Sequence, residues 1–173
     1  MRIELISPEV LAGRAAEFAG LLRDAVEQGA SIGFTLPLTE AELTDYWRKV
    51  GTEVAAGHKI LLAALGTGGR VMGSAQLALE SRANGRHRAE VQKVMVWAAQ
   101  RGRGIGAALM TRVETEARAR GRRLLFLDTS AGESGAVKFY ERLGYAFAGS
   151  IPDYASDPDG QLVPNAIFYK KLT

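Results

Sequence analysis

The feature that most constrains this chain is a glycine-rich run, Arg101-Gly102-Arg103-Gly104-Ile105-Gly106. An apolar, strand-like stretch precedes it, and a helical stretch follows directly. Glycines at such a junction allow a sharp turn and a close approach of the backbone to a ligand. The first amide groups of a helix have no partner within the helix and lie at its positive end. The run therefore predicts an anion site, most often for phosphate, to which the two arginines add charge.

Length, composition and charge narrow the class of protein. The 173 residues are expected to form one domain, 1–173, and the apolar share of 47% is ordinary for a soluble globular protein. No apolar run approaches the roughly 20 residues that span a membrane. The N-terminus also lacks the apolar core of a signal peptide, so a cytoplasmic protein without membrane contact is expected. The net charge of +3 gives no argument for nucleic acid.

Residue usage argues against metal and thiol chemistry. The chain has no cysteine, which excludes disulfides, thiolate metal sites and a cysteine nucleophile. Its two histidines, His58 and His87, are far apart in sequence and fit no ligand spacing. No metal site is therefore expected.

The first half of the chain predicts a strand, two helices and an antiparallel meander. One long helix is expected to start at Ser7 and to run to about residue 28, where Gly29 ends it. Thr39 caps a second helix, with Glu42 completing a capping box. Three strands with short connections follow and imply a meander, at 60–65, 71–79 and 87–97.

The second half predicts one crossover unit and a closing hairpin of strands. A helix over 105–120 ends at Gly121, and a short apolar strand, 124–127, ends in Asp128. Strand, helix and strand at this spacing imply a right-handed crossover and parallel pairing. The remaining predicted elements are a helix at 132–142 and strands at 145–151 and 166–171.

Two loops are candidates for walls of a substrate pocket. The segment 29–38 interleaves turn residues with large apolar ones, and it is read either as a packed loop or as a pocket wall with Phe34 as a contact. The polar loop 152–164 carries Tyr154, a second candidate contact. We expect the choice of substrate to depend on these two loops.

Two motifs resemble those of a known family. The glycine run resembles the Q/R-x-x-G-x-G/A motif of the GNAT superfamily of N-acetyltransferases, which binds the pyrophosphate of acetyl-CoA. A second run, Ala136 to Tyr145, reads AVKFYERLGY and resembles that family's signature A-x-x-F-Y-x-x-L-G-F/Y. Within the family, the runs 29–34, 88–93 and 151–154 resemble the branch that contains the tabtoxin resistance protein.

The resemblance implies a mixed α/β fold and a way of holding acetyl-CoA. The implied fold has a central, mostly antiparallel sheet of about seven strands, one parallel strand–helix–strand unit and flanking helices. The strand before the glycine loop splays from the strand after the helix, and its free backbone pairs with the pantetheine arm. The residues implied to bind the cofactor are Val94, Met95, Val96, Arg101, Gly102, Arg103, Gly104, Ile105, Gly106 and Ala107.

The implied reaction is transfer of an acetyl group from acetyl-CoA to a primary amine of a small molecule. An amino acid or a toxin-like amine is the implied acceptor, which makes detoxification an expected role. Because a free alkyl amine has a pKa of about 10, a base must remove its proton. The thioester carbonyl needs a hydrogen-bond donor as it becomes tetrahedral, and the leaving thiolate benefits from an acid.

Tyr140 and Glu90 are candidates for the acid and the base by the same resemblance, and Asp128 is a candidate by its place in the predicted sheet. Tyr140 falls on the family's tyrosine position and is the candidate acid, although a tyrosine at helical spacing is by default a packed residue. Glu90 is one candidate base, and its alternative role is an ion pair with Arg88 or Lys93. Asp128 is the second candidate base, because ligands gather at the carboxyl ends of parallel strands. Its alternative role is to cap the turn 129–132.

One departure from the family pattern and two rival functions stay open. Glu133 stands where the family often has an asparagine that touches the cofactor. Gly102, Gly104 and Ala107 also fit the G-x-G-x-x-G/A fingerprint of dinucleotide enzymes, but here the run comes late and only one crossover follows. The other rival is a CoA-binding sensor without catalysis. A homodimer is a further expectation that the sequence does not decide.

Overall fold

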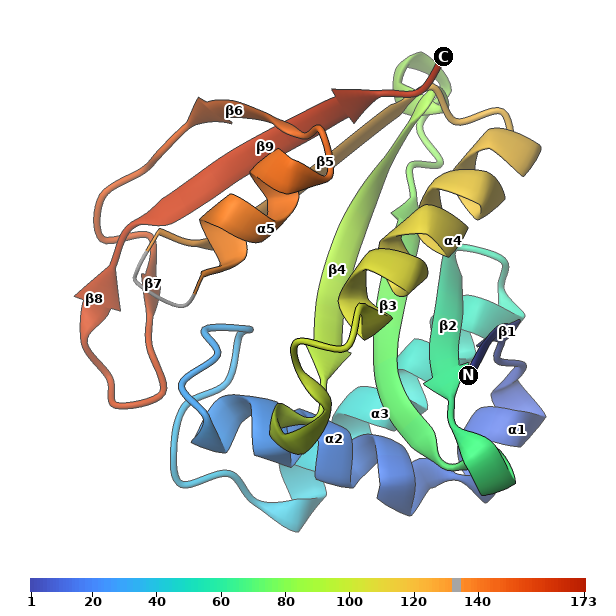
Figure 1. Ribbon diagram of the computed structural model, residues 1–173, viewed down its shortest axis with the longest axis vertical. Helices are drawn as coiled ribbons and strands as arrows, with labels where there is room; N and C mark the ends of the chain where they lie inside the picture. The colour runs from blue at the N-terminus through green and yellow to red at the C-terminus, as the bar shows by residue number, and fades with distance from the viewer. Residues whose placement is uncertain (132–134) are drawn as a thin grey trace.

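A seven-stranded sheet crosses the computed structural model, whose described residues are 1–131 and 135–173 (Figure 1). The strand order is β1-β2-β3-β4-β5-β9-β6, and a separate two-stranded sheet pairs β7 with β8. Among the strands that the structure describes, only β4 and β5 pair in parallel. The strands are β1 (Arg2–Leu5), β2 (Lys59–Leu65), β3 (Val71–Leu79), β4 (Arg88–Val96), β5 (Leu124–Ser130), β6 (Ala146–Gly149), β7 (Ala155–Ser156), β8 (Leu162–Val163) and β9 (Asn165–Lys171). This arrangement confirms the predicted mixed α/β fold with one parallel unit.

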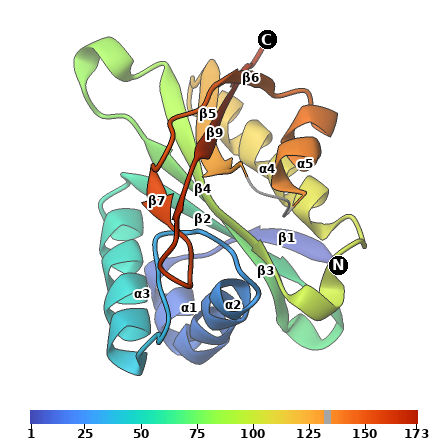
Figure 2. The same cartoon turned by 90° about the vertical axis from the view of Figure 1, so that its left-hand side faces the viewer.

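Helices cover both faces of the sheet, as Figure 2 shows with the sheet nearly edge-on. On one face lie α1 (Pro8–Gly13), α2 (Ala15–Glu27) and α3 (Glu40–Ala55), and on the other lie α4 (Ile105–Ala119) and α5 (Ala136–Arg142). Short 3-10 turns occur at Thr67–Gly69, Ala83–Gly85 and Ala98–Gln100. In the described part of the chain, no helix is both long and apolar enough to cross a bilayer.

Two hydrophobic cores form because side chains alternate along the strands. On β2, Leu62 and Ala64 belong to the core under α4, whereas Leu61, Ala63 and Leu65 belong to the core under α1 to α3. All five are buried. A strand buried on both faces reads as a continuous apolar run, which is the pattern of β2 in the sequence.

The predicted single helix from Ser7 to residue 28 is wrong, since it breaks at Arg14. Arg14 leaves the helical conformation, with φ −122° and ψ 17°. Its guanidinium donates to Glu17 and to the carbonyl of Gly69 in the β2–β3 hairpin. Glu17 in turn accepts from the amide of Val71 at 3.0 Å. These tertiary contacts favour the break, and they lie beyond the reach of a local pattern.

The caps of the helices on this face form as predicted. Ser7 Oγ accepts from the amide of Val10 at 3.3 Å, and Thr39 and Glu42 form a reciprocal capping box. Gly29 ends α2 with a φ of +83°. Val10 of α1 is 44% exposed although it is apolar.

The C-terminal third contains two further differences from the predicted elements. β5 extends to Ser130, because β9 pairs with it as far as Asn165. The polar segment 152–164 contains the β7–β8 hairpin, where Asp157 Oδ1 accepts from the amides at 159 and 161. The predicted helix 132–142 is observed as α5 from Ala136, and residues 132–134, with Glu133, lie outside the described residues.

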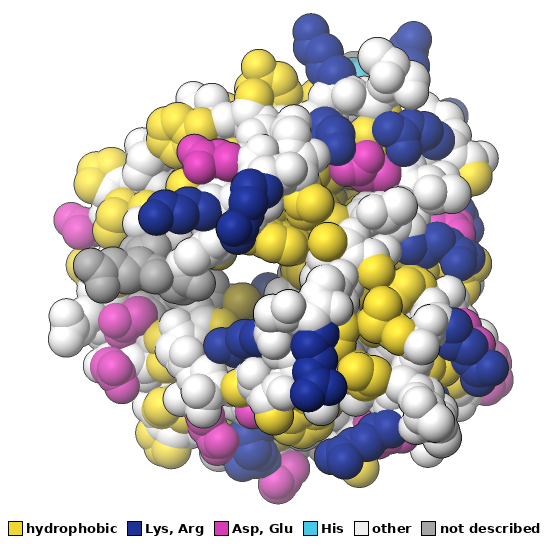
Figure 3. Space-filling view, in the orientation of Figure 1, with side chains coloured by type: hydrophobic (Ala, Val, Ile, Leu, Met, Phe, Trp, Pro, Cys, Tyr) yellow, Lys and Arg dark blue, Asp and Glu magenta, His cyan; other side chains and the backbone are white. Residues whose placement is uncertain are grey.

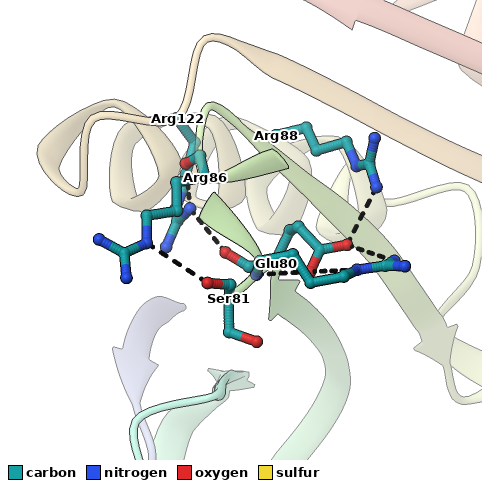
Figure 4. A network of polar contacts seen from close by, with 6 residues as sticks. Glu80, Ser81, Arg86, Arg88 and Arg122 are labelled. Carbon is teal, nitrogen blue, oxygen red and sulfur yellow. Dashed lines mark hydrogen bonds and ion pairs between the residues drawn. The ribbon is translucent and has the colours of Figure 1, made fainter. Parts of the chain in front are cut away.

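A polar network ties the hairpin between β3 and β4 to the loop after α4 (Figure 4). The carboxylate of Glu80 accepts from Arg82 at 2.7 Å and from Arg88 at 3.0 Å. Arg122 donates to the carbonyl oxygens of Glu80 and Arg86. The hydrogen bonds from Arg82, and then from Arg88, hold the pKa of the Glu80 carboxyl well below its usual range. The network fixes the end of β4 at which its pairing with β5 begins.

Candidate active site

The site begins where β4 and β5 separate. The two strands pair at only three positions, from Arg88 opposite Leu124 to Glu90 opposite Phe126. Beyond that point they diverge, as the V between them in Figure 1 shows. β5 continues its pairing with β9 on its other side. The edge of β4 that faces β5 therefore has no strand partner beyond Glu90 among the described residues, and its backbone groups are available to a ligand.

A β-bulge in β4 marks the point of separation. Ser74 of β3 pairs with Met95 and Gln76 pairs with Gln92, so two residues of β4, Lys93 and Val94, oppose one residue of β3. Lys93 has a φ of +49°, a backbone conformation that is uncommon for residues other than glycine. A bulge of this kind bends its strand and is frequent beside active sites.

The glycine run forms the turn and the helix start that its sequence predicts. Gly102 and Gly104 both have a φ of +76°, and α4 begins at Ile105. A Cβ on Gly106 would lie 3.2 Å from the ring of Phe139, so this glycine lets α4 and α5 approach closely. The first amides of α4 face the open end of the V, where an anion can accept from them.

A cavity of about 540 Å³ occupies this end of the V. Figure 3 shows the molecule hollowed between α5 and the loop that follows α2, with Lys and Arg side chains near the opening. Arg103 is exposed and lies outside this cavity's described lining. The other residues predicted to bind the cofactor all line it: Val94, Met95, Val96, Arg101, Gly102, Gly104, Ile105, Gly106 and Ala107.

Tyr140 also lines the larger cavity, and its hydroxyl is held in the neutral form. The residue is 8% exposed and packs between the rings of Phe139 and Tyr145. Burial, and after it the negative charge of Asp128, raises the pKa of the Tyr140 hydroxyl. A tyrosine that keeps its proton throughout the physiological range can donate it to a leaving thiolate.

A second cavity of about 220 Å³ adjoins the first, because residues 31, 32, 129 and 130 line both. The smaller cavity brings together Glu90 from β4, Asp128 from β5 and Tyr154 from the loop before β7. Glu90 forms no ion pair with Arg88 or Lys93 within the described residues, because Arg88 bonds to Glu80, although the charge of Glu90 acts on Lys93. Two carboxylates thus face one small space beside the larger cavity.

Phe34 does not line either of the two cavities described above. Its ring packs edge-on against Tyr46, with 5.2 Å between the ring centroids, as the packed-loop interpretation of the segment expects. Ser31, Ile32 and Gly33 of the same segment line the smaller cavity instead. The segment thus contributes to a cavity wall through other residues than Phe34, because side-chain size does not reveal which way a loop turns.

Sequence reasoning missed two residues of the smaller cavity, Lys93 and Asn165. Lys93 was considered only as a partner for Glu90. Its local signal was a lysine within an otherwise apolar strand end. Asn165 carried no local signal, because its place in the cavity depends on pairing between β5 and β9. Among residues 1–131 and 135–173, no group of three or more His, Asp or Glu side chains is placed to hold a metal ion.

Comparison with known proteins decides the family. A sequence model of the acetyltransferase (GNAT) family matches residues 23–145, which is more than half of the chain. The chain belongs to the GNAT family. GNAT acetyltransferases use acetyl-CoA as the acetyl donor, which is the cofactor that the resemblance of the two motifs implied.

Individual GNAT relatives agree with this assignment. An IAA acetyltransferase of Azospirillum brasilense is 32% identical over 90 residues, which cover 52% of this chain and 57% of that protein. The match therefore spans little more than half of that relative. Among solved structures, the ribosomal-protein-alanine N-acetyltransferase of Brucella melitensis has a TM-score of 0.80 at 22% identity, covering 99% of this chain and 100% of its own. The yncA acetyltransferase of Salmonella typhimurium, solved with acetyl-CoA, also scores 0.80, at 17% identity over 99% and 94% of the two chains. At these identities the two structures show the shared fold.

The larger cavity fits the cofactor that GNAT enzymes use. Its floor is the unpaired edge of β4, which offers backbone groups to the amides of a pantetheine arm. Its end is the start of α4, where Arg101 adds positive charge for a diphosphate. Gln100 lines the same cavity, and its Oε1 is buried without a hydrogen-bond partner among the described residues. A buried acceptor of this kind is satisfied when a ligand donor reaches it.

Proposed function

We propose that the protein transfers the acetyl group of acetyl-CoA to the primary amine of a small molecule. The observation that carries this proposal is the meeting of the two cavities. The larger one offers an anion-binding helix start and a free strand edge, and the smaller one holds two carboxylates beside it. Tyr140 lies on the wall of the larger cavity, and the charge of Asp128 in the smaller cavity contributes, after burial, to raising the pKa of its hydroxyl.

Cofactor binding, removal of the amine proton and protonation of the leaving thiolate each have a group of this chain to serve them. Acetyl-CoA, when bound, supplies the acetyl group as a thioester. The amides at the start of α4 and the side chain of Arg101 would hold its diphosphate, and the edge of β4 would orient its pantetheine arm. Glu90 or Asp128 takes a proton from the incoming ammonium, directly or through water. Tyr140 holds the proton that the leaving thiolate needs.

The proposal also covers the acceptor, the branch of the family, the cellular location and the oligomeric state. A small amine fits a cavity of about 220 Å³, and Tyr154 on its wall is the proposed acceptor contact. Membership of the branch that contains the tabtoxin resistance protein, and with it a role in detoxification, stays a prediction from the sequence. A single domain over 1–173, a cytoplasmic location and a homodimer are also predictions, the last testable by light scattering after gel filtration.

Two measurements test the proposal against its rivals. In a thermal-shift comparison, acetyl-CoA at about 100 times its dissociation constant should add about 2.7 kcal/mol to stability, whereas NAD and NADP should not. Release of CoA thiol should then depend on an added amine from a broad panel. A shift with a nicotinamide cofactor alone would favour the dinucleotide enzyme. Binding of acetyl-CoA with no acceptor-dependent thiol release across the panel would favour the sensor.

A further inference from the structure

The smaller cavity contains a lysine, Lys93, that forms no ion pair among the described residues. Lys93 stands at the bulge of β4 and lines this cavity, and no ion pair or hydrogen bond of its ammonium occurs within the described ranges. Its side chain reaches across to the loop after α2, since a Cβ on Gly33 would lie 3.7 Å from Lys93 Nζ. Burial and then the nearby Lys59 lower the pKa of Lys93, which Asp128 and Glu90 partly oppose. An ammonium held in this way is matched to an anion from outside the chain.

A buried donor lines the same cavity. Asn165 is 3% exposed, and its Oδ1 accepts from the amide of Ile151 at 2.9 Å. That hydrogen bond fixes the orientation of the side-chain amide, because only the oxygen can accept it. Nδ2 is then left buried with no hydrogen-bond partner in the described part of the chain. A buried N–H donor without a partner costs stability, so it is expected to serve a ligand or a water.

The acidic groups of the cavity complete a pattern of two opposite charges. Asp128 and Asn165 lie on one face of the β5–β9 ladder, because Asn165 pairs with Ser130 and side chains alternate along a strand. Glu90 contributes the second carboxylate from β4. Neither Glu90 nor Asp128 has an ion pair among residues 1–131 and 135–173. The cavity therefore presents acceptors for an ammonium group and donors for an anion.

We propose that Lys93 and Asn165 bind a carboxylate of the acceptor, which makes the substrate an amine that also carries a carboxylate group. The inference rests on the proposed acetyl transfer and deepens it by naming the substrate class. Lys93 Nζ supplies the charge and Asn165 Nδ2 supplies a directed hydrogen bond. Glu90 and Asp128 remain free to receive the ammonium, so the acceptor is oriented by both of its ends.

Matched acceptor pairs test the inference. The probes are L-leucine, L-methionine, glycine and β-alanine, each against its primary carboxamide, with kcat/KM measured by thiol release from acetyl-CoA. The wild type should favour the best acid over its amide by about 10- to 100-fold, the scale of hydrogen bonds to a charged group. Since amidation also lowers the pKa of the amine, intrinsic reactivity favours the amide and works against this result.

Variants connect that preference to the two residues. Lys93→Met and Asn165→Ala should each reduce the ratio of acid to amide by about 10-fold, and Lys93→Arg should keep most of it. Lys171→Met, at an exposed position of β9, is the matched control and should leave the ratio unchanged. Circular dichroism and the acetyl-CoA thermal shift verify that each variant is folded. Equal use of acids and amides by the wild type, or a ratio that survives in both cavity variants, would overturn the inference.

A separate outcome would identify a failure of the proposed function itself. If no amine of any kind is acetylated, calorimetric binding of the same pairs to the CoA-loaded protein still decides the question of the anion site. Binding of an acid but not its amide, lost in Lys93→Met, would support the site without acetyl transfer. Equal binding of the pairs, or no binding of either, would overturn it.

Discussion

Asp128 and Tyr140 are electrostatically connected across the junction of the two cavities. Burial of Tyr140 is the larger cause of its raised pKa, and the charge of Asp128 is the second. A carboxylate that makes a neighbouring hydroxyl harder to ionise keeps that hydroxyl a proton donor. The same carboxylate is a candidate to receive the proton of the amine. Tyr140 therefore keeps its proton at neutral pH beside a carboxylate that is a candidate base.

Replacement of Tyr140 by Phe should separate catalysis from binding. Loss of a general acid costs about 10²- to 10⁴-fold, so kcat should fall by that factor while the thermal shift with acetyl-CoA is retained. Tyr145 offers a matched control, because its ring lies 5.9 Å from that of Tyr140 and it lines neither described cavity. Tyr145→Phe should keep kcat within about three-fold, well inside the effect of a lost acid. A Tyr140→Phe enzyme with full turnover would remove the hydroxyl from the mechanism.

The close approach of β3 to β4 predicts a sensitive position at Gly73. An added Cβ would lie 2.7 Å from the backbone carbonyl oxygen of Met95, which cannot move without shifting β4. Gly73→Ala should therefore destabilise the protein by about 1–3 kcal/mol. Gly13→Ala is the control, since nothing lies within 4 Å of its Cβ position. Thermal unfolding of both variants measures the difference, and equal melting temperatures would contradict the packing of the two strands.

The charged ammonium of Lys93 should lower the stability of the folded protein. Its pKa in the folded protein lies below the ordinary value, so the unfolded chain binds the proton more tightly. Below the folded pKa the charged lysine therefore destabilises the fold, and this penalty fades as the pH rises toward about 10.4. Lys93→Met should melt roughly 2–4 °C higher than the wild type at pH 7, the shift expected for a change near 1 kcal/mol.

The pH dependence of that difference is its control. The gain of Lys93→Met over the wild type should shrink between pH 7 and pH 10, measured by denaturant unfolding, and Lys93→Arg should show no gain at either pH. A destabilised Lys93→Met at neutral pH would mean that the ammonium is neutralised in the folded protein. That result would also weaken the inferred anion site.

The Glu80 network should make the β3–β4 hairpin sensitive to acid. The arginine contacts lower the pKa of Glu80 in the folded state, so its contribution is fully present above the unfolded value of about 4.3. It is lost as the pH falls further toward the folded pKa. Glu80→Gln should therefore lessen the loss of stability between pH 5 and pH 3 relative to the wild type. Glu4→Gln, at an exposed pair with Arg2, is the control and should follow the wild-type curve.

Much of the fold was predictable because its strongest signals are local. The glycines of the run at 101–106, the capping box at Thr39 and the apolar strands each act within a few residues. The break at Arg14 was not predictable, since it depends on a contact with Gly69, 55 residues away. The bulge at Lys93 likewise depends on the register between β3 and β4.

The residues of the candidate site also differ in whether their signal is local or depends on distant parts of the chain. Tyr140 and the predicted cofactor contacts lie in two short stretches of chain, 136–145 and 94–107, and the structure gathers all of them except Arg103 around one cavity. Asn165 enters the smaller cavity only through pairing of β9 with β5, and nothing in its immediate sequence distinguishes it. Residues that act through distant partners are thus the ones that the sequence concealed.

The most direct test of acetyl transfer is mass spectrometry of the amine after incubation with isotopically labelled acetyl-CoA and the purified protein. The account predicts labelled N-acetyl product in an amount equal to the thiol released, formed by the wild type and at least about 100-fold more slowly by Tyr140→Phe. Thiol release without labelled amide, or no labelled product from any amine in the panel, would contradict it.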